Sequence, residues 1–171
     1  MLHHVSVGVA NVENAARFYD PVLRALGYRR VMEFLPYAIG YGDMAPQFWV
    51  QLPHNQQAAS AGNGVHIGFA AASQQAVRAF HQAALAAGAA DEGAPGPRPD
   101  YSPNYYGAFV RDPEGHKLEA VFFEMAVSKP AAAGKGKAKR KAKAGAKRKA
   151  KKPAQRKSSA RRPVRGRTRK R

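Results

Sequence analysis

The sequence contains no cysteine, so disulfide bonds, thiolate catalysis, cysteine-ligated zinc and iron–sulfur clusters are all excluded. The absence fits a reducing compartment, and we expect a cytoplasmic protein. No stretch approaches the roughly eighteen consecutive apolar residues of a membrane-spanning helix, so no span is expected. The first residues also lack a charged segment followed by an apolar one, and no secretory signal is expected.

Acidic residues are missing from the last part of the chain. Residues 129–171 contain twenty-one Lys and Arg and no Asp or Glu, whereas residues 1–128 contain all eleven acidic residues and eight basic ones. The formal net charge of +18 therefore belongs to the C-terminal segment. This division predicts a slightly acidic globular domain over residues 1–128 and a polycationic tail over residues 129–171.

The tail also has almost no large apolar residues, with Val164 as the exception. It cannot bury a core, so we expect it to be disordered, and its composition resembles the tails of linker-histone-like proteins. A polycation of this kind binds nucleic acid by releasing counterions from phosphates, without reading the base sequence. RNA, anionic membranes and acidic proteins are alternative partners. The basic residues expected to contact phosphates include Lys139, Arg140, Lys141, Lys147, Arg148, Lys149, Arg161 and Arg162.

The globular part repeats one pattern of strand and helix. Residues 2–9 and 65–70 predict strands, and the capping residues Asn11 and Ser73 open the helix-like segments that follow them. We expect Pro21 to kink the first helix or to split off its last turn. The remaining strands are predicted over residues 28–34, 37–41, 47–52, 89–92, 105–111 and 117–123, with a loop over residues 93–97. This order predicts an α+β fold of two tandem βαβββ modules that form a cupped mixed sheet.

Alternation along the strands places four polar side chains on one side of the expected sheets. The phase opposite to the apolar residues that pack under the helices carries His4, Gln51, His66 and Glu119. If the sheets curve, this phase lines a concavity, where two imidazoles, an amide and a carboxylate suit a divalent metal. The alternative for each residue is structural, since a strand histidine is often only hydrogen-bonded and a carboxylate or amide can face solvent.

Three segments carry a resemblance to a known family. They are residues 4–9 (HVSVGV), 64–69 (GVHIGF) and 105–121 (YYGAFVRDPEGHKLEAV), and the last is the most specific because of its Asp-Pro-Glu-Gly turn followed by Leu-Glu. The chain resembles, over roughly residues 2–124, the vicinal oxygen chelate superfamily. This superfamily includes glyoxalases, extradiol dioxygenases and bleomycin-resistance proteins.

The resemblance implies a fold of paired modules around a divalent ion, whether Fe, Mn, Ni, Zn or Mg. Members with a full metal set use a His on the first strand, a Glu or Gln on the fourth, a His on the fifth and a Glu on the eighth. These roles fall on His4, Gln51, His66 and Glu119. The metal then chelates the substrate through two adjacent oxygens and acts as a Lewis acid, and Glu119 is also a candidate for moving protons. The resemblance also implies a homodimer.

Other readings of the domain remain open at this point. Without Gln51, the ligands form a 2-His-1-carboxylate set that suits non-haem iron and oxygen chemistry. A metal-free protein that binds or sequesters a small molecule has the same fold, and a nucleoid-associated DNA-binding protein with an accessory domain is a third reading. Candidate residues for a substrate pocket are Trp49, Tyr41, Tyr105, Tyr106 and Phe123. His116 follows a turn glycine, and we expect it to be exposed.

We expect the tail to retain the full chain on duplex DNA at low salt, because its like charges displace the condensed counterions of the phosphates. The logarithm of the binding constant should fall linearly with the logarithm of the salt concentration, and deletion of residues 129–171 should abolish retention. Gel-shift titrations at several salt concentrations check this. Retention that survives the deletion would place the activity in residues 1–128 instead.

Overall fold

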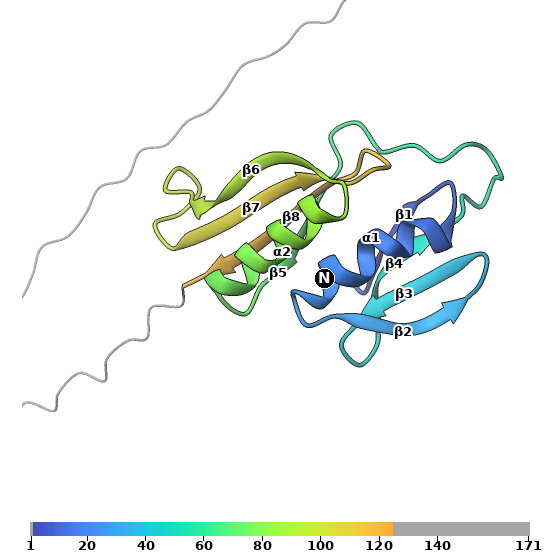
Figure 1. Cartoon of the computed structure of the whole chain (residues 1–171), viewed down its shortest axis with the longest axis horizontal. Helices are drawn as coiled ribbons and strands as arrows, with labels where there is room; N and C mark the ends of the chain where they lie inside the picture. Colours follow the sequence, from blue (N-terminus) through green and yellow to red (C-terminus); the bar gives the residue numbers. More distant parts are fainter. Residues whose placement is uncertain (1, 125–171) are drawn as a thin grey trace, which may run out of the picture. The chain divides into compact units, whose positions relative to one another are not determined.

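The computed structural model describes residues 2–124, so the tail predicted over residues 129–171 lies outside the described residues. The described part consists of two βαβββ modules, as the sequence predicts (Figure 1). The first contains β1 (Val5–Gly8), α1 (Val12–Arg24), β2 (Arg29–Phe34), β3 (Ala38–Gly42) and β4 (Pro46–Gln51). The second contains β5 (His66–Ala70), α2 (Gln74–Ala86), β6 (Ala90–Pro97), β7 (Tyr105–Arg111) and β8 (Lys117–Phe123).

Each module forms one mixed sheet with the same connectivity. The strand orders are β1-β4-β3-β2 and β5-β8-β7-β6, with the first strand of each module parallel to the last. In the registers of these parallel pairs, Gly8 lies opposite Gln51 and Gly68 lies opposite Glu119. The two modules therefore place Gln51 and Glu119 at equivalent positions, which confirms the predicted repeat.

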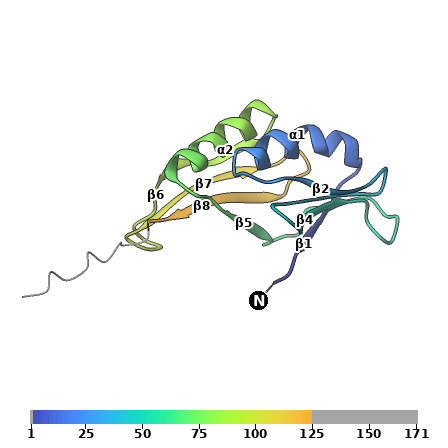
Figure 2. The same cartoon turned by 90° about the horizontal axis from the view of Figure 1, so that it is seen from below.

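The helices cover the same side of both sheets (Figure 2). Their N-terminal backbone amides are capped as expected, by Asn11 on Asn14 at 2.8 Å and by Ser73 on Ala76 at 3.1 Å. The core lies between the helices and the sheets and is formed by apolar side chains of both modules. No helix among residues 2–124 is long and apolar enough to cross a membrane.

Pro21 does not split off the last turn of α1, and the loop expected over residues 93–97 belongs to a strand. Helix α1 runs through Pro21 to Arg24 as one element, and Ala25 still donates a backbone hydrogen bond to the carbonyl of Pro21 at 3.2 Å. Residues 93–97, expected to form a loop, continue β6 to Pro97. Register shifts on both sides of Gly93 absorb the irregular residues, and Pro97 is tolerated because β6 is an edge strand.

A buried polar cluster joins the β7–β8 turn to the first module. The Tyr19 hydroxyl on α1 donates to one carboxylate oxygen of Asp112, and the other oxygen accepts from the backbone N–H groups of Glu114 and His116 at 3.0 and 2.7 Å. The His116 ring is 6% exposed, with Nε2 3.0 Å from the carbonyl oxygen of Gly8. The expected exposure of His116 is therefore wrong, because the turn folds its ring back onto the end of β1.

Replacing Tyr19 by Phe should lower the free energy of unfolding by about 1–3 kcal/mol, because it leaves a buried carboxylate oxygen of Asp112 without its donor. Burial and the nearby Asp112 carboxylate raise the pKa of Tyr19, so its hydroxyl stays protonated and donating at neutral pH. Urea denaturation measures the change. Tyr37→Phe, at a position 66% exposed, is the matched control and should change the stability little. Equal losses in both variants would contradict the account.

Candidate functional site

His66 and Glu119 meet on the sheet face that the helices leave uncovered. His66 Nε2 lies 3.1 Å from Glu119 Oε2, while the Tyr105 hydroxyl donates to Oε1 at 2.5 Å. Glu119 is only 3% exposed, and its two oxygens are held by these two partners. Burying a carboxylate costs free energy unless it is paired in this way. The two partners also fix the orientation of the Glu119 carboxylate.

Glycine on the neighbouring strands makes room for this carboxylate. A Cβ at Gly107 would lie 2.8 Å from Glu119 Oε1 and 3.0 Å from the Tyr105 ring, which is closer than real side chains approach. A Cβ at Gly68, opposite Glu119 on β5, would lie at an ordinary 3.6 Å from Oε2. A side chain at position 107 would therefore force the Glu119 carboxylate or the Tyr105 ring to shift, while one at position 68 would not.

Tyr105 is the hydrogen-bond donor of the group. Burial, the hydrogen bond to Glu119 and the Glu119 charge raise the pKa of Tyr105 above its ordinary value, so the hydroxyl keeps its proton at neutral pH. Its ring packs edge-on against Phe123 and Tyr101, with centroids 4.9 and 5.2 Å away. These aromatic contacts fix the hydroxyl that orients Glu119.

The first module has its own polar and aromatic set on the uncovered face. His4 and Gln51 line a cavity of about 310 Å³ together with Ser6, Phe34, Ala38 and Trp49. The rings of Trp49 and Phe34 are stacked, with centroids 6.2 Å apart. Nδ1 of His4 lies 2.9 Å from Nδ1 of His3.

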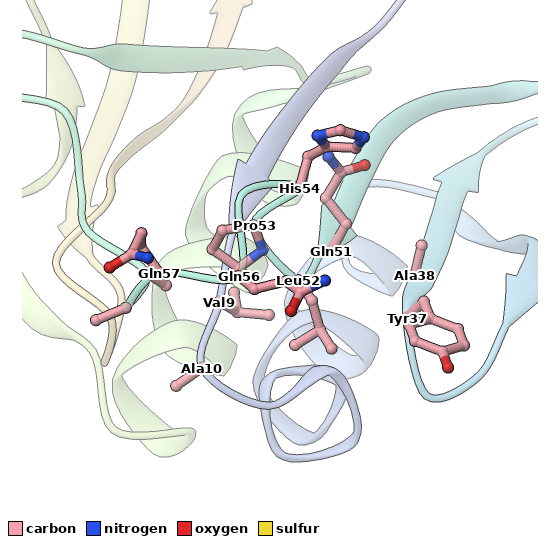
Figure 3. A pocket seen from close by; sticks show the side chains of 12 residues that line it. Val9, Ala10, Tyr37, Ala38, Gln51, Leu52, Pro53, His54, Gln56 and Gln57 are labelled. Atoms are coloured by element: carbon pink, nitrogen blue, oxygen red, sulfur yellow. The ribbon is translucent and has the colours of Figure 1, made fainter.

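Gln51 also borders a larger cavity at the end of β4 (Figure 3). This cavity has a volume of about 930 Å³, and the segment after β4, including His54 and two glutamines, forms much of its wall. Gln51 thus lies between the two cavities of the first module. The sequence analysis did not anticipate this wall.

The four residues proposed as metal ligands are found as two pairs. His66 and Glu119 are in contact, and His4 and Gln51 line a common cavity. Among residues 2–124 of one chain, no three His, Asp or Glu side chains are grouped so that they would hold a metal ion. Each module of a single chain therefore supplies half of the set that the sequence suggested.

The candidate pocket residues are divided between the two faces. Trp49, Tyr105 and Phe123 lie on the uncovered face with the polar pairs. Tyr41 instead lies in the core, where its hydroxyl donates to Asp20 at 2.9 Å. Tyr106 packs against the core, and its hydroxyl accepts from Arg78 at 2.9 Å. Consecutive strand residues face opposite sides, so Tyr105 and Tyr106 cannot line the same pocket.

A third cavity on this face was missed by sequence reasoning. It has a volume of about 300 Å³ and is lined by Gly62, Asn63, Gly64, Val65, His66, Arg111 and Lys117. Strand pairing is the feature that would have revealed this cavity, because Lys117 pairs with His66 on one side and with Arg111 on the other. Pairing places these side chains in one row, although they are far apart in the sequence.

Comparison with known proteins agrees with this architecture. The family model described as Glyoxalase/Bleomycin resistance protein/Dioxygenase superfamily matches residues 1–120. A crystal structure of a glyoxalase/bleomycin resistance protein from Albidiferax ferrireducens is 38% identical, with a TM-score of 0.63, and the match covers 71% of this chain and 97% of that one. The chain therefore belongs to the glyoxalase/bleomycin resistance protein/dioxygenase superfamily.

More distant structures share the fold. A glyoxalase-related enzyme from Fulvimarina pelagi is 22% identical with a TM-score of 0.56, over 71% of this chain and 87% of that one. A lactoylglutathione lyase from Agrobacterium tumefaciens is 18% identical with a TM-score of 0.51, over 71% of this chain and 92% of that one. No curated protein sequence matches the chain.

Gly107→Ala should displace the Glu119 carboxylate, because the new methyl group would lie too close to Oε1. Tyr105 would lose both its acceptor and the nearby negative charge, so the pKa of Tyr105 should fall toward the ordinary tyrosine value of about 10. Titration of the Tyr105 ring carbon by NMR measures this. Gly68→Ala is the matched control and should leave the titration unchanged; a Tyr105 pKa unaffected by Gly107→Ala would contradict the described packing.

Proposed function

We propose that the chain is a divalent-metal-dependent enzyme that acts on a small molecule through two adjacent oxygens, by lyase, isomerase or dioxygenase chemistry. The observation that carries this proposal is the buried Glu119 carboxylate with His66 at 3.1 Å, on a sheet face that also carries the aromatic Tyr105. A carboxylate and an imidazole are common ligands of metal ions in proteins. Membership of the superfamily supports the same class of function.

The geometry of the pair fits a metal ion. His66 Nε2 and Glu119 Oε2 are the two atoms that would hold it. The 3.1 Å between these two atoms is the length of a direct N–H···O hydrogen bond, which brings both donor atoms to one place. Two imidazoles, one carboxylate and one amide suit Fe, Mn, Ni, Zn or Mg to differing degrees, so the donor set alone does not choose among them.

We further propose that a second copy of the chain completes the site. His4 and Gln51 of one copy would face His66 and Glu119 of the other, which gives a homodimer with two equivalent sites. The support for this arrangement is that each module supplies one pair, on a face that its own helix leaves uncovered. Exposed aromatic side chains on these faces, Phe34 and Phe123 among them, also favour burial in an assembly.

In such a site the bound ion supplies Lewis acidity for a substrate oxyanion. The protein's own contribution begins with Glu119, whose Oε2 would hold the ion beside His66 and whose Oε1 would accept a substrate proton. The Tyr105 hydroxyl donates to Oε1, so it orients the carboxylate. The same hydrogen bond stabilises the charged form of Glu119. In the proposed dimer, the stacked Trp49 and Phe34 would keep water from the first module's side of the pocket.

Two further functions are proposed at a lower level of detail. A metal-free protein that binds or sequesters a small molecule would use the same cavities, without Glu119 as a ligand. The tail supports a separate activity, nonspecific binding of nucleic acid, because residues 129–171 carry twenty-one basic residues and no acidic residue. This activity is compatible with either reading of the domain and with a nucleoid-associated location in the cytoplasm.

Metal content decides between the enzyme and the metal-free protein. The full chain, purified without chelator or affinity metal, should carry about one transition metal per chain by elemental mass spectrometry. Glu119→Gln should lose most of it, because a neutral amide replaces the only carboxylate of the set. Glu13→Gln removes one exposed carboxylate from α1 and should keep the metal.

Two results would contradict the metal-site proposal. A chain that binds no Mn, Fe, Ni or Zn, even after each is added at neutral pH, would overturn the catalytic proposal. Equal metal content in Glu119→Gln and Glu13→Gln would show that the metal is held elsewhere.

A further inference from the structure

Three side chains form a row across the second sheet, beside the His66–Glu119 pair. Lys117 on β8 is paired with His66 on β5 and with Arg111 on β7, so all three lie at the same level of the sheet. They line one cavity of about 300 Å³ together with residues 62–65. The cavity therefore borders the proposed metal site through His66.

The cavity wall carries positive charge and no carboxylate. Arg111 and Lys117 line it, while their common partner Glu92 lies outside the lining. Arg111 Nε donates to Glu92 at 2.5 Å and Nη1 donates to the carbonyl of Gly115 at 2.7 Å. These two contacts fix the guanidinium and leave Nη2 for a ligand. Lys117 lies 3.5 Å from Glu92, a long contact that leaves ammonium hydrogens available.

An aromatic ring supports this cationic row. The Lys117 ammonium and the Arg98 guanidinium each lie 5.5 Å from the centroid of the Phe109 ring. The ring of His66 is tilted against Phe109, with centroids 5.8 Å apart. Lys117 is thus positioned by the Phe109 ring, which lowers the entropy that it loses when an anion binds.

We propose that this cavity binds an anionic group of the substrate, a carboxylate or a phosphate, through Arg111 and Lys117. The inference rests on the proposed function, which it deepens by naming a substrate class: small anionic molecules. Lys117 and Glu119 are two residues apart on one strand face, about 7 Å along the strand. The anionic group would therefore be separated by a few bonds from the oxygens that approach the His66–Glu119 pair.

A purely structural role for the row makes a different prediction. If Arg111 and Lys117 serve only as partners of Glu92, removing the Glu92 charge would weaken the sheet and leave anion binding unaffected. If the cavity is an anion site, Glu92→Gln removes a competing carboxylate and should tighten anion binding. This variant separates the two roles because the cavity wall itself is unchanged.

NMR titration of the metal-free full chain tests the inference locally. Methylphosphonate and acetate serve as separate probes, and the better one indicates whether the group is phosphate-like or carboxylate-like. Saturable shifts are expected for the amides of residues 62–66 and 117. Lys117→Gln should weaken binding by about ten-fold or more, Lys117→Arg should restore it, and Arg17→Gln, on the exposed face of α1, should have no effect.

The anion site and the metal site can fail independently in these experiments. Cavity shifts that are equal in Lys117→Gln and the unchanged chain, or shifts confined to residues 129–171, would overturn the anion site. Because the titration uses metal-free protein, it gives its answer whatever the metal content proves to be. Loss of metal in Glu119→Gln with unchanged anion binding in that variant would support both proposals independently.

Discussion

Burial of the Glu119 carboxylate is the constraint on which the second module's uncovered face depends. A carboxylate that is almost fully removed from water needs charged or hydrogen-bonded partners, and His66 and Tyr105 supply one for each oxygen. Gly107 leaves the space, and Phe123 and Tyr101 hold the ring of Tyr105. A fold stabilised by apolar packing alone would gain by placing an aliphatic residue here, so the carboxylate is most simply explained by function.

The two faces of each sheet separate stability from function. One face packs under α1 and α2 and contains the core, including Tyr41 and the Tyr19–Asp112 hydrogen bond that ties the β7–β8 turn to α1. The other face carries the polar pairs and the stacked Phe34 and Trp49. Because the modules repeat one pattern, Gln51 and Glu119 occupy equivalent positions, opposite Gly8 and Gly68.

Much of this could be predicted from the sequence, because alternation and capping are local. They predicted the modules, the caps at Asn11 and Ser73, and the face of His66 and Glu119. Pairing is not local, so the row of His66, Lys117 and Arg111 and the buried ring of His116 could not be predicted. Tyr105 and Tyr106 are consecutive on β7, so alternation allows only one of them to lie on the uncovered face, and that residue is Tyr105.

We propose that two chains share each metal site, and a mixture of two defective variants tests this arrangement. His4→Ala and Glu119→Ala should each bind little metal alone, because every site lacks one ligand. If sites form between chains, unfolding and refolding them together yields mixed dimers in which one of two sites has all its ligands. We predict that the mixture recovers metal, as measured by elemental mass spectrometry after gel filtration. A mixture that binds no more metal than its separate components would contradict the claim.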